Sequence, residues 1–240
     1  MENEDQKITT YLVDKKLPLD ILLEVKDHMS DQISALESEK SLSFDEAFEQ
    51  IKISWEQDLK MRFSFFSNRF SKITRLQNKM MMQNQFRILR KSLILIFTIF
   101  LSTSFFILYV PELSKYVLLV IYIITAVSGV VFSIYDRKLL KTTKVNYKNN
   151  ISIFQRSTGN LMLVGALFIL NNNIFNFDER FLKISESIQA LFIQHMFSFK
   201  SISYLITGYI FVFGVIHGYI CYINYKKAVS KIKERMVLEF

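Results

Sequence analysis

The second part of the chain contains long apolar segments without charged side chains. Three of them cover residues 92–110, 116–135 and 202–223, and none contains Asp, Glu, Lys or Arg. A helix needs about 20 residues, each rising about 1.5 Å, to cross about 30 Å of hydrocarbon. We therefore predict that these segments span a membrane. Residues 157–176 form a fourth predicted span, with a shorter apolar centre and with Ser, Thr and Asn near its ends.

The first part of the chain has the spacing of short amphipathic helices. Apolar residues recur every three or four positions over residues 22–36 and again over residues 44–59, which is typical of helices with one buried face. Ser43 and Glu46 have the spacing of a capping box, so the second helix is predicted to begin there. With a short helix closer to the N-terminus, these segments predict a small helical domain.

A third pattern connects this domain to the first span. Apolar or amide side chains with a heptad-like spacing follow one another at Leu59, Phe63, Phe66, Phe70, Ile73, Gln77 and Met80. Basic residues occupy the other faces, so residues 61–91 are predicted to form a basic amphipathic connecting helix. Such a helix can lie on anionic headgroups, pair with another helix or continue into the first span, or it can be a solvated linker whose apolar stripe is covered by the helical domain itself.

Charge gives the predicted spans an orientation. Residues 1–60 carry 15 acidic and 7 basic side chains, whereas the rest of the chain is strongly basic. Bases gather before the first span, between the second and third spans and after the fourth, and the positive-inside rule places such segments in the cytoplasm. Four crossings with both termini in the cytoplasm satisfy these counts.

These patterns together predict an all-α protein with four parts. Residues 1–60 form an acidic cytosolic helical domain and residues 61–91 the connecting helix. Residues 92–225 form a four-helix transmembrane bundle, and residues 226–240 a basic cytosolic tail. The outer segment 184–199 is predicted to form a helix lying on the outer surface of the membrane.

Composition narrows the class of protein further. The net charge of +8 does not indicate nucleic-acid binding, because the bases lie beside apolar spans and would face anionic lipid. A single cysteine, Cys221, excludes an intramolecular disulfide and a cysteine-based zinc site. We expect no secretory signal peptide, because about 90 polar and charged residues precede the first apolar run. The lipid bilayer is the first predicted partner.

Small and polar residues within the predicted spans are candidates for helix packing. Gly214 and Gly218 form a small-xxx-small pattern, and Gly165 lies in the third span. We interpret these glycines as packing residues within the bundle, with contact between two copies in a homo-oligomer as the alternative. His217 and Cys221 share a face of the fourth span, but two side chains do not make a metal site, so no metal or cofactor is predicted.

Signatures of catalysis are missing from the sequence. It contains no Gly-x-Ser-x-Gly, no glycine-rich phosphate loop and no His-Glu-x-x-His motif. Transporters of polar solutes normally place ionisable groups at the bilayer midplane, and the predicted spans do not. We therefore expect no enzyme activity and no transport by this chain alone.

One part of the chain resembles a known type of domain. Residues 11–55 contain Leu17-Pro18, an acidic helix through Glu24 and Asp27, and a turn into a helix with Ser43, Glu46 and Ala47. This stretch is similar to the small helical domain that precedes membrane spans in the HAAS (DUF1700-like) and permease-prefix families. The resemblance implies a cytosolic regulatory or interaction domain without catalytic residues. A helical prefix on four spans is also similar to membrane proteins of Bacteroidetes-type bacteria.

The sequence therefore favours an accessory or regulatory protein of the bacterial inner membrane. Its acidic helices would bind a protein partner, while the spans hold them at the inner face. The candidate partner-binding side chains are the large apolar ones of the two helices, namely Leu22, Val25, Met29, Phe48 and Trp55. The alternative is a subunit of a transporter or channel assembly.

Overall fold

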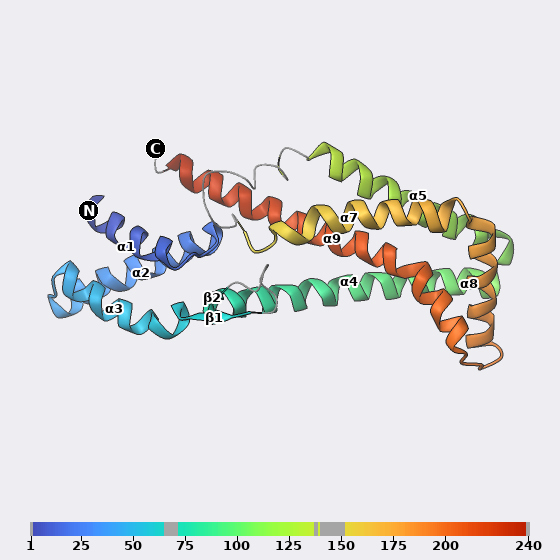
Figure 1. The fold of residues 1–240 in the computed structure, drawn as a ribbon, viewed down its shortest axis with the longest axis horizontal. Helices are drawn as coiled ribbons and strands as arrows, with labels where there is room; N and C mark the ends of the chain where they lie inside the picture. Colours follow the sequence, from blue (N-terminus) through green and yellow to red (C-terminus); the bar gives the residue numbers. More distant parts are fainter. Residues whose placement is uncertain (1, 65–71, 137–138, 140–151, 239–240) are drawn as a thin grey trace. The chain divides into compact units, whose positions relative to one another are not determined.

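Helices make up nearly all of the described chain (Figure 1). The computed structural model describes residues 2–64, 72–136, 139 and 152–238. The predicted all-α class is confirmed for these residues, apart from one short pair of strands. The elements are α1 (Glu2–Asp14), α2 (Leu19–Lys40), α3 (Phe44–Leu59), β1 (Met61–Phe63), β2 (Lys72–Thr74), α4 (Arg75–Tyr109), α5 (Pro111–Tyr135), α7 (Gln155–Phe168), the π-helix η3 (Ile169–Ile174), α8 (Phe177–Phe192) and α9 (Phe199–Leu238).

The chain divides into two compact units. The first comprises Met1–Gln85, Thr143–Ile153 and Lys226–Phe240. The second comprises Phe86–Thr142 and Phe154–Tyr225. Both α4 and α9 contribute one end to the first unit and the remainder to the second.

The first unit is built on the three helices that precede the strands. The capping box that begins α3 is confirmed, because the Glu46 N–H donates to Ser43 Oγ and Glu46 Oε2 accepts from the Ser43 N–H at 3.0 Å. Each helix turns one apolar face inward, as its periodicity predicts. The shared core consists of Ile8, Leu12, Leu17, Ile21, Leu22, Val25, Met29, Ile33, Ala47, Phe48, Ile51 and Leu59.

The predicted connecting helix over residues 61–91 is wrong in its first half. Residues Met61–Phe63 and Lys72–Thr74 instead pair as antiparallel strands, with Arg62 opposite Ile73. Serine, threonine and β-branched residues are weak helix formers, and they are frequent in this stretch. The Thr74 hydroxyl then accepts the Gln77 N–H at 3.1 Å, which caps the new helix.

From this cap onward the chain is helical. Helix α4 begins at Arg75 and runs without a break through the first predicted span to Tyr109, so continuation into the span is the alternative that the structure selects. Of the heptad-like residues, Leu59 and Ile73 are buried whereas Phe63 is exposed. Phe66 and Phe70 lie outside the described residues.

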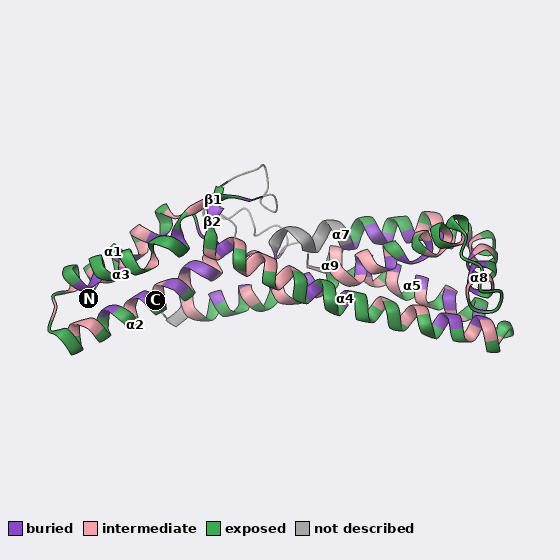
Figure 2. Ribbon diagram, turned by 90° about the horizontal axis from the view of Figure 1, so that it is seen from below, coloured by how far each residue is buried: buried purple, intermediate pink, exposed green. Residues whose placement is uncertain are grey.

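The second unit is a bundle of apolar helices. Helices α4, α5 and α9 are long and apolar enough to cross a membrane, and Met162–Ile174 is a shorter apolar helix. In Figures 1 and 2, α4, α5, α7 and α9 run alongside one another, and α8 lies across one end of the bundle. Many large apolar side chains on the outside of α4 and α5 are exposed, as lipid-facing residues are (Figure 2).

Two boundaries in this bundle differ from the sequence prediction. The predicted outer helix over residues 184–199 is instead α8, which begins at Phe177, ends at Phe192 and buries Ile184 and Ile188 against the bundle. The predicted tail at residues 226–240 is not a separate element, because α9 remains helical to Leu238. Hydropathy detects where an apolar span lies. A helix continues past the apolar residues as long as its backbone N–H and carbonyl groups remain hydrogen-bonded.

Candidate functional site

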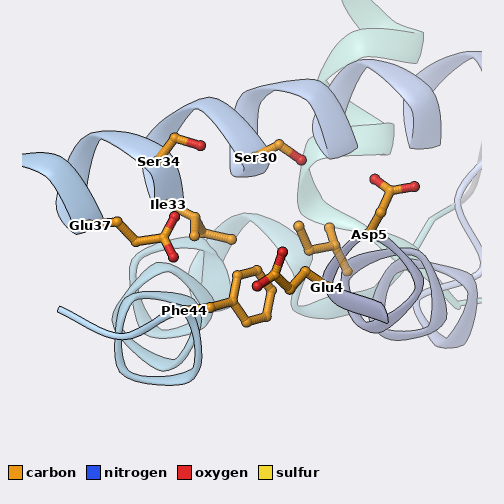
Figure 3. A pocket seen from close by; sticks show the side chains of 8 residues that line it. Glu4, Asp5, Ser30, Ile33, Ser34, Glu37 and Phe44 are labelled. Atoms are coloured by element: carbon orange, nitrogen blue, oxygen red, sulfur yellow. The ribbon is translucent and has the colours of Figure 1, made fainter. Parts of the chain in front are cut away.

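The helical domain contains a hollow of about 380 Å³ between its helices (Figure 3). Helix α2 contributes one face with the helical spacing of three and four residues, and α1 and the first residue of α3 close the other sides. The lining residues are Glu4, Asp5, Ile8, Ser30, Ile33, Ser34, Glu37 and Phe44.

The hollow combines an apolar floor with an acidic rim. Ile8 and Ile33 are buried below, and the Phe44 ring stacks on Phe48 with 5.7 Å between the ring centroids. Figure 3 shows Glu4 and Glu37 extending from α1 and α2 toward the Phe44 ring. An apolar floor with carboxylates above it suits a cationic group on an apolar stem, such as a lysine or arginine side chain.

One wall of this hollow is fixed by ion pairs. Lys26 Nζ lies 2.7 Å from Asp5 Oδ2 and joins α2 to α1. Lys7 Nζ lies 2.6 Å from Asp45 Oδ1 and joins α1 to the start of α3. These exposed pairs link the three helices around the hollow, while the shared apolar core packs them together.

The predicted partner-binding residues do not form the lining of this hollow. Leu22, Val25, Met29 and Phe48 are buried in the core of the domain. Trp55 is partly buried, and its Nε1–H donates to Gln32 Oε1 at 2.8 Å. The structure therefore gives these side chains a packing role.

Helix α2 makes a second set of contacts, with the C-terminal end of α9. Arg235 Nη1 lies 2.7 Å from Asp27 Oδ2. A smaller hollow of about 140 Å³ lies between the same helices, with both acidic and basic side chains around it. Its lining residues are Asp20, Leu23, Glu24, Ala228, Lys231, Ile232 and Arg235.

Asp20 joins these helices to a third segment of the chain. Its carboxylate accepts hydrogen bonds from the Ser152 hydroxyl and from the Ile153 N–H, and from the Ile21 N–H at 2.9 Å. Burial raises the pKa of the Asp20 carboxyl to about 6, against the lowering effect of these hydrogen bonds. Helix α2, the segment before α7 and the end of α9 are thus held together by one cluster of polar contacts.

Polar side chains also connect the helices inside the second unit. The Gly208 carbonyl accepts hydrogen bonds from Tyr122 Oη and from Asn173 Nδ2, each at 3.2 Å. Arg180 Nη1 donates to Thr207 Oγ1 at 3.3 Å. The Thr103 and Tyr209 hydroxyls lie 2.6 Å apart. Because polar groups inside a bundle need partners, these bonds fix how α4, α5, η3 and α8 meet α9.

His217 and Cys221, the two side chains predicted to share a face of α9, lie in different environments. His217 Nδ1 lies 3.2 Å from Ser92 Oγ, which is a hydrogen bond between α9 and α4. Cys221 is buried. Within the described part of the chain, no group of three or more His, Cys, Asp and Glu side chains could hold a metal ion. The described geometry gives His217 a role in helix packing.

Two of the predicted packing glycines differ sharply. A Cβ atom on Gly165 would lie 2.9 Å from Val215 Cγ2 and 3.1 Å from the Phe211 carbonyl oxygen, so α7 and α9 approach closely there. A Cβ atom on Gly214 would meet no described atom within 4 Å. Gly218 is buried. Gly129, which the small-xxx-small pattern does not include, packs against Ala166 in the same way as Gly165 packs against Val215.

Comparisons of this chain with models of protein families, with curated proteins and with solved structures find no match. The acidic hollow of the helical domain is the described feature best suited to recognising another molecule. Sequence reasoning missed Glu4, Ser34 and Glu37; Ser34 and Glu37 lie beside the buried stripe of α2, but Glu4 comes from α1 and joins them only when the helices pack.

Proposed function

We propose that this chain is a non-enzymatic accessory or regulatory protein of the bacterial inner membrane. Its helical domain binds a protein partner on the cytoplasmic side, and the apolar helices hold that domain at the membrane. The acidic hollow with its apolar floor is the observation that carries this proposal. The resemblance to the HAAS and permease-prefix families is a further reason to assign an interaction role to this domain.

We also propose that the bundle crosses the membrane four times. The N-terminal helices contact both the segment at Ser152 and the end of α9 at Arg235, which supports a topology with all three on the same side of the membrane. Returning to one side requires an even number of crossings. Three helices are long enough by themselves, so α7 together with η3 supplies the fourth crossing. Positive flanks place this shared side in the cytoplasm.

A charge reversal in the hollow tests partner binding. The double substitution Glu4→Lys and Glu37→Lys replaces the acidic rim with a basic one, and we expect it to reduce partner recovery at least tenfold, or about 1.4 kcal/mol. The measurement is purification of the tagged full-length protein from its native membranes in mild detergent, with quantification of the proteins that co-purify.

The matched control carries the same change of charge away from the hollow. Glu56 and Asp58 are exposed on α3 and do not line it. Glu56→Lys with Asp58→Lys should therefore leave recovery unchanged. If the parent protein and both double variants recover the same amount of partner, binding through the hollow is contradicted. Loss with both double variants would show only that the domain's net charge matters.

The alternative function is that of a subunit in a transporter or channel assembly. The observation in its favour is the open space beside Gly214, where no described helix packs against α9. A second copy or another membrane protein could pack there. Cross-linking of a Gly214→Cys variant in native membranes tests this alternative. A subunit interface at Gly214 gives a discrete cross-linked product, and a lipid-facing residue does not.

A further inference from the structure

The connection between α8 and α9 carries a group of uncovered apolar side chains. Ile193 is 64% exposed, Met196 62%, Phe197 78% and Phe199 90%. None of residues 193–199 is Asp, Glu, Lys or Arg. Apolar groups this dense at the surface of a protein mark contact with another molecule or with a membrane.

This group continues the lipid-facing surface of the bundle. Ile202, Ile206 and Ile210 are exposed on one face of α9, within a helix apolar enough to cross a membrane. Phe199 precedes Ile202 by three residues, so it lies at the end of the same stripe. The surface that meets lipid along α9 therefore extends past the beginning of the helix into the connection.

Several backbone groups of this connection are hydrogen-bonded within the chain. The N–H groups of Ile193 and Met196 donate to the carbonyls of Gln189 and Ala190, each at 2.9 Å. The Ser201 N–H at the start of α9 donates to Ser198 Oγ at 3.0 Å. Bare backbone groups are what exclude irregular segments from lipid. This segment shields several of them and directs apolar side chains outward.

We propose that residues 193–199 form a wedge that inserts into the boundary between the lipid headgroups and the acyl chains. The partner of this surface is the bilayer itself. The wedge lies at the end of the bundle that α8 covers (Figure 1). It fixes α8 along the membrane surface, where charged residues such as Glu186 are exposed and would face water. This role is independent of partner binding by the helical domain.

Tryptophan fluorescence in lipid vesicles tests the wedge. Trp55 is the single tryptophan of the chain. In a Trp55→Phe background, Phe197→Trp places one reporter in the wedge, and Glu186→Trp places one on exposed α8 as the matched control. Each full-length protein is reconstituted in phosphatidylcholine vesicles in which one lipid is brominated, either near the headgroup or near the end of the acyl chain.

We expect bromine near the headgroup to quench the Phe197→Trp emission several-fold more strongly than it quenches the Glu186→Trp emission. The Phe197→Trp emission should also lie at shorter wavelength. Bromine near the chain end should quench the wedge reporter less, because the wedge sits at the boundary. Equal, weak quenching of both reporters would overturn the proposal and leave the apolar group to a protein partner. Met196→Trp repeats the measurement if Phe197→Trp does not fold.

Discussion

Replacing Gly165 with leucine is expected to destabilise the bundle by about 3 kcal/mol, the upper end of the range for overpacking a tight contact. Even the Cβ atom would lie 3.1 Å from the Phe211 carbonyl oxygen, which belongs to the backbone of α9 and cannot turn aside. The two helices must therefore separate. The measurement is the midpoint of thermal unfolding in mild detergent, followed by circular dichroism, which should fall by several degrees.

Gly214→Leu is the matched control, because it makes the same change on a helix of the same bundle. A Cβ atom there meets no described atom within 4 Å, so the midpoint should hardly change. If both substitutions lower the midpoint equally, the close approach at Gly165 does not hold the bundle together. If Gly214→Leu instead changes the size of the detergent complex, α9 contacts another subunit through Gly214.

Asp20→Asn is expected to stabilise the helical domain at neutral pH. The pKa of Asp20 is raised from 3.8 to about 6, so the folded state holds a proton that the unfolded state has already lost. Stability therefore falls as the pH rises through this interval, and the full cost of the buried charge is present above the folded pKa. Asparagine keeps an acceptor for the Ile21 N–H and carries no charge.

The expected gain in the free energy of unfolding is up to about 3 kcal/mol at neutral pH, since one pKa unit corresponds to about 1.36 kcal/mol. The gain disappears near pH 4. Trp55 fluorescence during unfolding in urea reports on this domain at a series of pH values. Asp31→Asn changes an exposed carboxylate of the same helix and should leave stability unchanged. A variant at Asp20 that is less stable than the parent at neutral pH would show that the ionised carboxylate is needed there.

Sequence periodicity predicted the elements that bury one continuous face. Helix α2 followed from apolar residues such as Val25 and Met29, and the start of α3 followed from Ser43 and Glu46, because these are local patterns. The strands at Arg62 and Ile73 were missed, since two strands of three residues each are too short to show a period of their own within a heptad-like spacing. Local helix propensity, which is low there, was the better guide.

The candidate site depended on contacts between segments far apart in the chain. The hollow exists because α1 and α3 pack on α2, and periodicity says nothing about which acidic residues then converge, such as Glu4 and Glu37. The Asp20 carboxylate likewise accepts a hydrogen bond from Ser152, more than a hundred residues away. Of the predicted packing glycines, Gly165 does approach a neighbouring helix closely, as Gly129 also does, whereas Gly214 does not, because a small residue permits a close approach without specifying a neighbour.

The central claim is that the chain crosses the membrane four times and holds its helical domain in the cytoplasm. Labelling with a membrane-impermeant maleimide tests it in intact cells. In a Cys221→Ser background, Asp45→Cys places a thiol on the helical domain and Glu186→Cys places one on α8, and both positions are exposed. Four crossings predict that Glu186→Cys is labelled in intact cells and Asp45→Cys only after the membrane is opened. If neither is labelled until then, α7 with η3 does not cross, and the account is contradicted.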